Sequence, residues 1–436
     1  MPAALKTATL GCKVNQYETE YVREGLLGLG FRDAGSEEAA DLCIVNTCTV
    51  TKEGDAKSRQ LIRRLARDNP QARIVVMGCY ATRAPEEVAA LPGVVEVVKD
   101  KRELPDLLGR FGVVDIPTGI SRFGNRHRAY VKVQDGCMLR CSYCIIPKVR
   151  PKLTSRPIRH ILEEMRRLVD NGYREIVLTG VHLGHYGVDW NGNQPKSDWT
   201  RLSDLVRKIV QIEGDFRVRL SSIEATEVTR ELIELMAEQP NKICPHLHVC
   251  LQSGSDAVLR RMKRRWGTRR FLDRCQLVSD RLDHPAFTTD VMVGFPGETD
   301  KDFEATCRVV RQVGFSKIHI FPFSPRHGTP AAEMPHRIPK RVVSERSRAL
   351  SDLERELRLQ FFHRLRNKNL RVLVEATSDH QADCNMGTSC RYAPVELPRH
   401  EACHGELVDV LAGPVENGRI QGRRQFNETE KDRGHR

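Results

Sequence analysis

The sequence predicts an α/β protein of three parts: an N-terminal doubly wound parallel-sheet domain, a central partial (β/α) barrel and a small C-terminal all-β barrel. Short apolar runs alternate with amphipathic helical stretches over residues 1–115, which predicts the first part. The same alternation returns within residues 123–365 and predicts the second. Residues 366–426 change to short strand-like runs separated by turns, and the chain of 436 residues has room for all three parts.

In the N-terminal domain, three apolar runs are typical of strands, and each is followed by a stretch with helical spacing. Strands that alternate with helices pair in parallel, because each helix carries the chain back across the sheet. The predicted strands are residues 7–10, 41–46 and 72–77, and the predicted helices are residues 15–29, 52–68 and a stretch from residue 85.

Three cysteines of this domain, Cys12, Cys48 and Cys79, each follow the carboxyl end of a predicted strand. Open α/β sheets bind ligands at that edge, so these thiols are expected to converge on one object. The alternative is chance placement of three structural cysteines, a residue type that is often buried. Cys43 lies within a predicted strand and is interpreted as a core residue.

A second set of cysteines, Cys137, Cys141 and Cys144, has the spacing C-x3-C-x2-C directly after an apolar strand at residues 129–133. A structural zinc site uses four ligands, and an ordinary ferredoxin cluster also uses four cysteines. Three thiolates on a 4Fe–4S cluster leave one iron open to a small molecule. The alternative is a three-cysteine zinc knuckle with a distant fourth ligand.

The barrel is predicted from six apolar runs that each end in polar or glycine-rich residues, after a linker at residues 116–128. Gly180, Glu224 and Gln252 follow three of these runs and therefore face the expected site. A tight turn at Gly180 and structural hydrogen bonds at Glu224 and Gln252 are the alternatives. The predicted strands are residues 129–133, 175–178, 217–221, 246–251, 288–293 and 317–321, and a helical connector covers residues 335–369.

The C-terminal part is predicted to contain strands at residues 371–376, 389–396 and 406–411, with a turn at 416–418. Cys384, Cys390 and Cys403 with His404 could suggest zinc, but their spacing matches no standard site.

The net charge is +13, and much of it is clustered. Residues 121–170 carry twelve Lys or Arg and four Asp or Glu, and a second cluster surrounds Trp266. Basic residues with an interleaved aromatic suit a phosphate backbone and an unstacked base, whereas a solvated helix face is the alternative. No apolar run approaches the ~20 residues of a membrane span, and no signal peptide is evident. The second cluster comprises Arg260, Arg261, Lys263, Arg264, Arg265, Arg269 and Arg270.

The C-x3-C-x2-C loop, with Tyr143 before its last cysteine, resembles the radical S-adenosylmethionine (SAM) superfamily. Residues 10–20, 46–50 and 77–80 resemble the N-terminal domain of methylthiotransferases, and the C-terminal strands resemble the TRAM module. Lys13-Val14-Asn15-Gln16-Tyr17-Glu18-Thr19 looks like the branch that acts on threonylcarbamoyladenosine in tRNA. The isopentenyladenosine branch typically has Gln-Met-Asn there, and the branch that acts on ribosomal proteins has Pro-Lys-Asn.

This resemblance implies a tRNA methylthiotransferase that adds a 2-methylthio group to N6-threonylcarbamoyladenosine at position 37. It implies two 4Fe–4S clusters, an auxiliary one on Cys12, Cys48 and Cys79 and another that binds SAM on the C-x3-C-x2-C loop. Tyr143, Gly180, Glu224 and Gln252 are expected to contact SAM, and Arg260, Arg261, Lys263, Arg264 and Arg265 to contact RNA.

The expected partners are the tRNA anticodon stem-loop, an electron donor such as flavodoxin or ferredoxin, and a sulfur source, with no membrane. Fourteen cysteines without a secretion signal suit a reducing cytoplasm. The same chemistry on isopentenyladenosine or on a ribosomal-protein aspartate is an alternative, as is a non-catalytic Fe–S electron-transfer or scaffold protein. The chain departs from the family where Pro151 replaces a glycine, which puts the shape of that loop in doubt.

Overall fold

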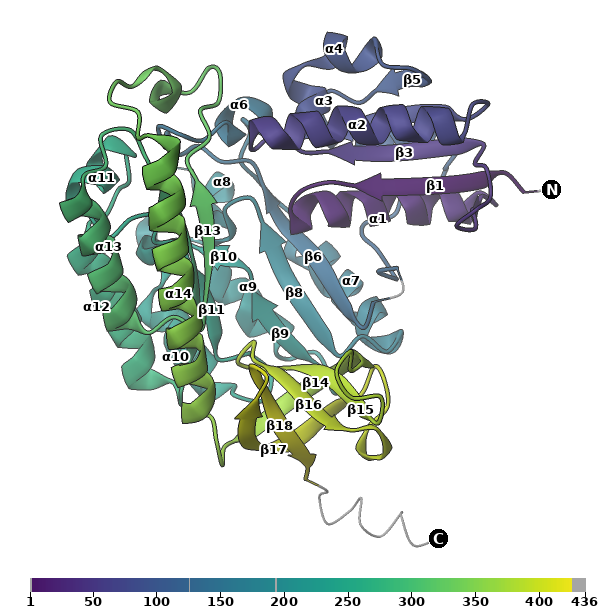
Figure 1. Ribbon diagram of the computed structural model, residues 1–436. Helices are drawn as coiled ribbons and strands as arrows, with labels where there is room; N and C mark the ends of the chain where they lie inside the picture. Colours follow the sequence, from purple (N-terminus) through teal and green to yellow (C-terminus); the bar gives the residue numbers. More distant parts are fainter. Residues whose placement is uncertain (1, 125, 193, 426–436) are drawn as a thin grey trace, which may run out of the picture.

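The computed structural model describes residues 2–124, 126–192 and 194–425. Residue 125 of the predicted linker and residue 426 at the end of the predicted last domain lie outside the described residues. Figure 1 shows the N-terminal domain above a central half-barrel and a small β-barrel below it. The fold class predicted from the sequence is confirmed in all three parts. In the described part of the chain, no helix is long and apolar enough to cross a membrane.

The N-terminal domain is a five-stranded, all-parallel sheet in the order β2-β1-β3-β4-β5. Leu5, Ile44 and Leu26 belong to the cluster that α1 and α5 cover on one face, whereas Cys43 and Ile62 belong to the cluster beneath α2 on the other. Cys43 is therefore a core residue, as predicted. The elements are β1 Ala4–Thr9, α1 Lys13–Gly28, β2 Arg32–Asp33, β3 Leu42–Thr47, α2 Lys52–Asp68, β4 Arg73–Gly78, α3 Cys79–Arg83, α4 Pro85–Ala89, β5 Val94–Val97 and α5 Leu104–Arg110.

Sequence analysis missed the short edge strands β2 and β5, because β2 has only two polar residues and the apolar run of β5 is four residues long and interrupted by Glu96.

The half-barrel combines the sheets β7-β6-β8-β9 and β10-β11-β12-β13, joined by a parallel bridge between Val218 and Ile243. All six predicted strands are present, with the two-residue strands β7 and β10 in addition. Its strands are β6 Arg128–Asp135, β7 Thr154–Ser155, β8 Glu175–Gly180, β9 Arg217–Leu220, β10 Ser222–Ile223, β11 His246–Val249, β12 Ala286–Val293 and β13 Lys317–Pro322.

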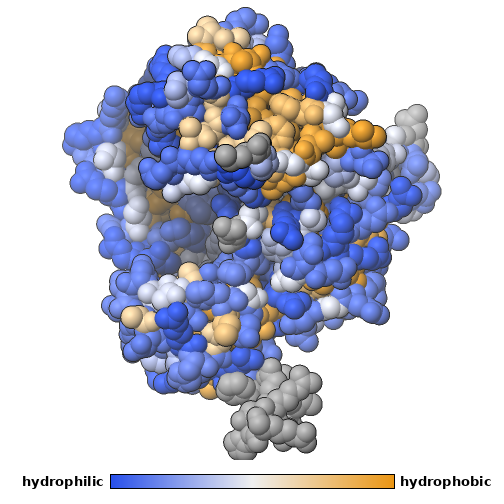
Figure 2. Space-filling view, turned by 90° about the vertical axis from the view of Figure 1, so that its right-hand side faces the viewer, coloured by the Kyte–Doolittle hydropathy of each residue, from blue (hydrophilic) through white to orange (hydrophobic). Residues whose placement is uncertain are grey.

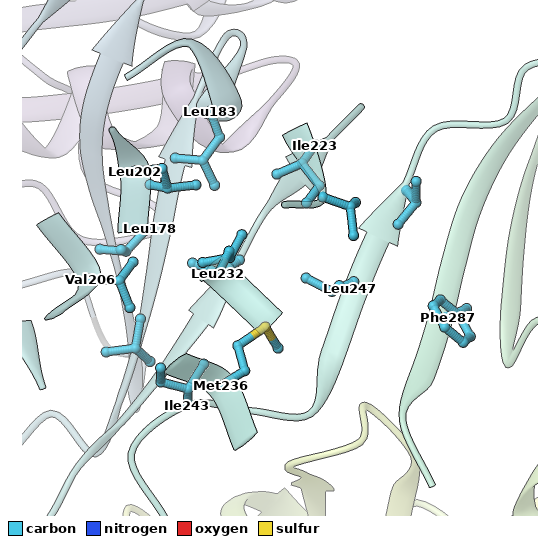
Figure 3. Packing of buried hydrophobic residues seen from close by; sticks show 14 of the residues in the cluster. Leu178, Leu183, Leu202, Val206, Ile223, Leu232, Met236, Ile243, Leu247 and Phe287 are labelled. Carbon is cyan, nitrogen blue, oxygen red and sulfur yellow. The ribbon is translucent and has the colours of Figure 1, made fainter. Parts of the chain in front are cut away.

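Helices cover the outer face of the half-barrel. Figure 3 shows Leu178 and Leu247 of the strands packed against Leu202 and Val206 of α9 and Leu232 of α10. The helices of this part are α6 Ile146–Val149, α7 Ile158–Asp170, α8 Val188–Asn191, α9 Leu202–Ile209, α10 Arg230–Glu238, α11 Asp256–Arg261, α12 Thr268–Arg281, α13 Asp300–Val313 and the connector α14 Lys340–Arg364.

The inner face of the half-barrel is polar, since the side chains that alternate with the outer core residues carry charge. Near its lower end, the buried Glu175 carboxylate accepts hydrogen bonds from Arg217 and Arg219. The same two arginines donate to backbone carbonyl oxygens of the C-terminal barrel, at Thr388 (2.8 Å) and Ser389 (3.0 Å). The C-terminal barrel therefore closes the lower end of the half-barrel.

The C-terminal part is a closed five-stranded barrel in the order β14-β15-β16-β18-β17. The predicted strand at 389–396 is wrong, because residues 390–393 form the turn between β15 and β16, with Tyr392 at φ 60°. Tyr392 stacks on His246 in the half-barrel, a long-range contact without a local signal. The strands are β14 Asn369–Thr377, β15 Cys384–Ser389, β16 Pro394–Pro398, β17 Leu407–Glu416 and β18 Arg419–Arg424.

Candidate active site

The cysteine loop begins where β6 ends, at a glycine that no other residue could replace without rearrangement. Gly136 has φ +76°, and a Cβ there would lie 1.9 Å from the carbonyl oxygen of Lys152. The Gln134 amide donates to the carbonyl oxygens of Asp135 and Gly136, both at 2.7 Å. The path of the loop is therefore fixed before the first cysteine.

The three thiols of this loop lie close enough to disfavour one another's ionisation. Burial and the neighbouring Cys141 and Cys137 thiolates raise the pKa of Cys144 to about 12. Burial also raises the pKa of Cys141, although the Arg264 guanidinium opposes this shift from 3.6 Å. A bound cation that holds all three as thiolates would remove this cost, so the site fits a metal cluster.

Beside the thiols lies a cavity of about 370 Å³ whose lining includes Cys141, Glu224 and Arg264. The Arg264 side chain is only 4% exposed and pairs with Glu224 at 2.8 Å. Its Nε and Nη2 atoms are buried without a hydrogen-bond partner among the described residues. Arg264 therefore places a positive charge beside the thiols at the wall of this cavity, a setting that suits a ligand with a carboxylate.

Of the four residues predicted to contact SAM, Tyr143 lies in the cysteine loop, Glu224 lines the cavity beside it, and Gly180 and Gln252 lie at or just after the carboxyl ends of β8 and β11. The Tyr143 hydroxyl is 3.4 Å from Arg264, and Glu224 pairs with the same arginine. Gly180 ends β8, where a Cβ would meet the Gln134 side chain at 2.9 Å. Gln252 follows β11 with φ 63° and bridges to β12. Their contacts with SAM stay predictions.

The cysteines of the N-terminal domain also converge, at the carboxyl edge of β1, β3 and β4. A Cβ on Gly11 would lie 3.1 Å from the sulfur of Cys48, which places Cys48 directly beside the residue before Cys12. Burial raises the pKa of Cys48 to about 11, and the Cys79 and Cys12 thiolates add to the shift. As thiolates these three side chains repel one another, like those of the loop, and a bound metal cluster would offset that repulsion. The site therefore fits a second cluster.

The two cysteine sites meet at the interface between the N-terminal domain and the half-barrel. Ile145, the residue after Cys144, packs with Val149 directly against Cys79. Next to this contact, the buried Arg150 guanidinium donates to Glu18 on α1 (2.7 Å) and to Asp135 (2.7 Å). Burial opposes the ionisation of Glu18. The positive charges of Arg150 and Lys132 nevertheless hold the pKa of Glu18 below its ordinary value. Arg150 therefore fastens α1 to the cysteine loop.

Replacement of this arginine by an apolar residue should loosen the interface. Arg150→Met leaves the buried Glu18 carboxylate and the partly buried Asp135 carboxylate without their main partner, so it should destabilise the folded protein by about 3–5 kcal/mol. Denaturant unfolding measures this change. Arg166→Met, at an exposed position on α7, is the matched control and should cost less than about 0.5 kcal/mol. Equal stability of the two variants would contradict the role of Arg150.

The basic cluster at residues 260–270 is divided in the structure. Arg260, Lys263 and Arg265 are exposed, and Arg261 is half-buried and donates to the carbonyl oxygen of Gly297. The interpretation of Trp266 as a surface for an unstacked base is wrong, because its side chain is 5% exposed and packs on Phe271.

Arg264 also points inward, where Glu224 neutralises it, so in this structure it is not available as an RNA contact.

Sequence analysis missed the histidines beside the loop. His182 Nδ1 lies 3.8 Å from the sulfur of Cys137, and the His182 ring stacks on His185 with centroids 3.7 Å apart. Glu227 is 3.4 Å from His182. The available signal was their position just after a predicted strand, in the same loop as Gly180.

Comparison with known proteins decides the family. Residues 131–310 match the Radical SAM superfamily, and residues 4–99 match the family described as Uncharacterized protein family UPF0004. The chain is 38% identical to "Threonylcarbamoyladenosine tRNA methylthiotransferase MtaB" of Bacillus subtilis, over 92% of both chains. The protein belongs to the radical SAM methylthiotransferases. A radical SAM enzyme of this kind uses a 4Fe–4S cluster and SAM, and the cysteine loop lies within the matched region.

Other relatives of this methylthiotransferase carry related names. It is 39% identical to the MtaB enzyme of Thermotoga maritima, over 85% of this chain and 86% of that protein. It is 36% identical to "tRNA-2-methylthio-N(6)-dimethylallyladenosine synthase" of Corynebacterium urealyticum, over 92% and 78%. Among solved structures, the radical SAM methyltransferase TsrM of Kitasatospora setae has a TM-score of 0.54 at 15% identity, over 76% and 77% of the two chains, and supports the fold alone.

Proposed function

We propose that this methylthiotransferase converts N6-threonylcarbamoyladenosine at position 37 of tRNA into its 2-methylthio derivative. The observation that carries the proposal is the meeting of two three-cysteine sites, since Ile145 beside one site packs on Cys79 of the other. The choice of nucleoside follows the two relatives named for threonylcarbamoyladenosine, which are 38% and 39% identical.

In this proposal, Cys137, Cys141 and Cys144 hold the cluster that binds SAM, and Cys12, Cys48 and Cys79 hold a second 4Fe–4S cluster as the sulfur carrier. Carbon 2 of adenine is an unactivated C–H that acid–base catalysis cannot open, so the bound cofactor supplies the radical chemistry. The protein's own groups bind and orient. Arg264 brings its positive charge to the cavity wall, where it attracts a ligand carboxylate, and Glu224 holds that guanidinium in place.

The proposal includes the tRNA anticodon stem-loop as substrate, an electron donor such as flavodoxin or ferredoxin, and a separate sulfur source, all within the cytoplasm. Relatives named for dimethylallyladenosine are 34–36% identical, so that nucleoside is the alternative substrate. Mass spectrometry of tRNA nucleosides from a deletion strain separates the two. Loss of 2-methylthio-threonylcarbamoyladenosine supports the proposal, and loss of only the isopentenyl product would refute it.

The exposed residues of the basic cluster should contribute to tRNA affinity through counterion release. Arg260→Gln with Lys263→Gln should weaken tRNA binding. The plot of log association constant against log salt concentration should also become less steep, by about 0.7–0.9 for each phosphate that the variant no longer neutralises. Fluorescence anisotropy across a salt series measures both. Lys301→Gln with Arg308→Gln on α13 removes the same charge from another exposed surface and should change little. Identical slopes in the two double variants would show that the cluster is a solvated surface.

A further inference from the structure

The inner face of the half-barrel carries a group of polar side chains that neither cysteine site uses. On β11 and β12, Leu247 and Val291 belong to the outer core, so His248 and Asp290, which alternate with them, face inward. Asp290 is 27% exposed on its side chain and His248 12%. Exposed His319 on β13 stands beside His248, with ring centroids 5.7 Å apart.

The His248 ring is held in a fixed orientation. Its Nδ1 lies 3.0 Å from the Thr288 hydroxyl, which is also 3.0 Å from Nε2 of His246. Below them, Tyr392 of the C-terminal barrel stacks on His246 and forms the floor. The free edge of His248 therefore points to Asp290, whose carboxylate oxygen is 3.3 Å from Nε2.

This group lies between the floor and the cysteine sites. Cys250 follows directly after β11, with its sulfur 4.0 Å from Asp290. Burial and then the Asp290 charge raise the pKa of Cys250, on which the charges of Arg264 and Glu224 also act. Burial, together with the charges of Arg219 and His248, lowers the pKa of His246. Figure 2 shows the molecule hollowed between its upper and lower parts, with largely hydrophilic walls.

We propose that His248, Asp290 and His319 form the binding site for the N6 substituent of the substrate adenosine. The inference rests on the proposed function and names the residues that select the nucleoside. A threonylcarbamoyl chain carries a carboxylate, a hydroxyl and amide N–H groups. The exposed His319 imidazole can donate to its carboxylate, Asp290 can accept from its hydroxyl or N–H, and His248 holds the Asp290 carboxylate in place.

An isopentenyl chain offers none of these partners. Its apolar carbons would desolvate the Asp290 carboxylate and the histidines without replacing their hydrogen bonds to water. A site built to hydrogen-bond a substrate discriminates strongly against an analogue that lacks those groups. The polar inner face should therefore favour the threonylcarbamoyl chain at the binding step.

The test uses the anaerobically reconstituted holoenzyme and two synthetic anticodon stem-loops that differ only in the N6 group, threonylcarbamoyl or isopentenyl. Binding is measured by fluorescence anisotropy without reductant, and KM and kcat for methylthiolation are measured separately. The variants are Asp290→Asn and His319→Leu, the latter at an exposed position. His363→Leu, exposed near the end of α14, is the matched control.

The expected result is a rise of about tenfold in Kd and KM for the threonylcarbamoyl RNA in each variant, with less than about a twofold change for the isopentenyl RNA. The control should keep the preference of the wild type. If the wild type methylthiolates the threonylcarbamoyl RNA and every variant keeps the same preference, the inference is overturned while the proposed function stands. If the wild type modifies only the isopentenyl RNA, the proposed function fails first.

Metal analysis supplies a second way to overturn the inference. His248, Cys250 and Asp290 place their ligand atoms within 4.8 Å of one another, an arrangement that could also hold a cation. Zinc and iron are measured in the wild type and in Asp290→Asn. An unchanged metal content supports a substrate site, and loss of one stoichiometric metal ion in the variant would assign the group to a metal instead.

Discussion

Replacing Cys137, Cys141 and Cys144 together with alanine should abolish SAM cleavage and leave about four of eight iron atoms per chain. The loop would keep its shape, because Gly136 and Gln134 fix it independently of the thiols. No thiolate would remain there to hold the cluster that binds SAM. Iron analysis and chromatographic detection of 5′-deoxyadenosine after reduction measure the two effects.

The control for this triple variant is Cys307→Ala, a half-buried cysteine on α13 that belongs to neither site. It should retain the full iron content and normal SAM cleavage. Full iron content in the triple variant would mean that these three cysteines hold no cluster. A triple variant that still forms 5′-deoxyadenosine would place SAM elsewhere on the protein.

The sequence predicted the placement of both cysteine sites because strand ends are a local property. Cys12, Cys48 and Cys79 follow apolar runs that could be recognised without any partner, and parallel strands meet at one edge. Likewise the C-x3-C-x2-C spacing lies within a single loop. The positions of both cysteine sites depend on strand order and on local spacing, and both can be recognised in a single sequence.

The parts that failed depend on partners distant in sequence. Arg264 and Trp266 look like surface residues in a basic stretch, but Glu224, forty or more positions away, draws both inward. Residues 390–393 look like part of a strand in the sequence, whereas they form a turn whose Tyr392 stacks on the distant His246. Local patterns of charged and apolar residues do not indicate which distant residues will be in contact.

The interface between the domains was also beyond local analysis. In the sequence, Arg150 is notable only because it precedes the unusual Pro151. In the structure its guanidinium donates hydrogen bonds to Glu18, Asn15 and Asp135. Pro151 does not prevent this, since Cys137 N–H still donates to the carbonyl oxygen of Arg150 at 3.2 Å. This network brings the two cysteine sites together.

Replacing Cys12, Cys48 and Cys79 together with alanine should eliminate the 2-methylthio product and preserve reductive cleavage of SAM. The loop cysteines and the unpartnered donors of Arg264 lie in the half-barrel and do not depend on these thiols. The variant should therefore still bind SAM but lack the sulfur carrier. Product is measured by nucleoside mass spectrometry, and SAM cleavage by 5′-deoxyadenosine in the same reaction.

The contact between Ile145 and Cys79 makes this the more demanding of the two tests, since alanine at position 79 shortens a side chain that packs beside the loop. Cys79→Ser with Cys12→Ser and Cys48→Ser keeps nearly the same volume and serves as the matched control for packing. Both triple variants should cleave SAM and neither should methylthiolate. Methylthio product from either variant would refute a sulfur-carrying role for these cysteines. If SAM cleavage were abolished in the alanine variant and kept in the serine variant, packing at Ile145, and not the sulfur carrier, would account for the difference.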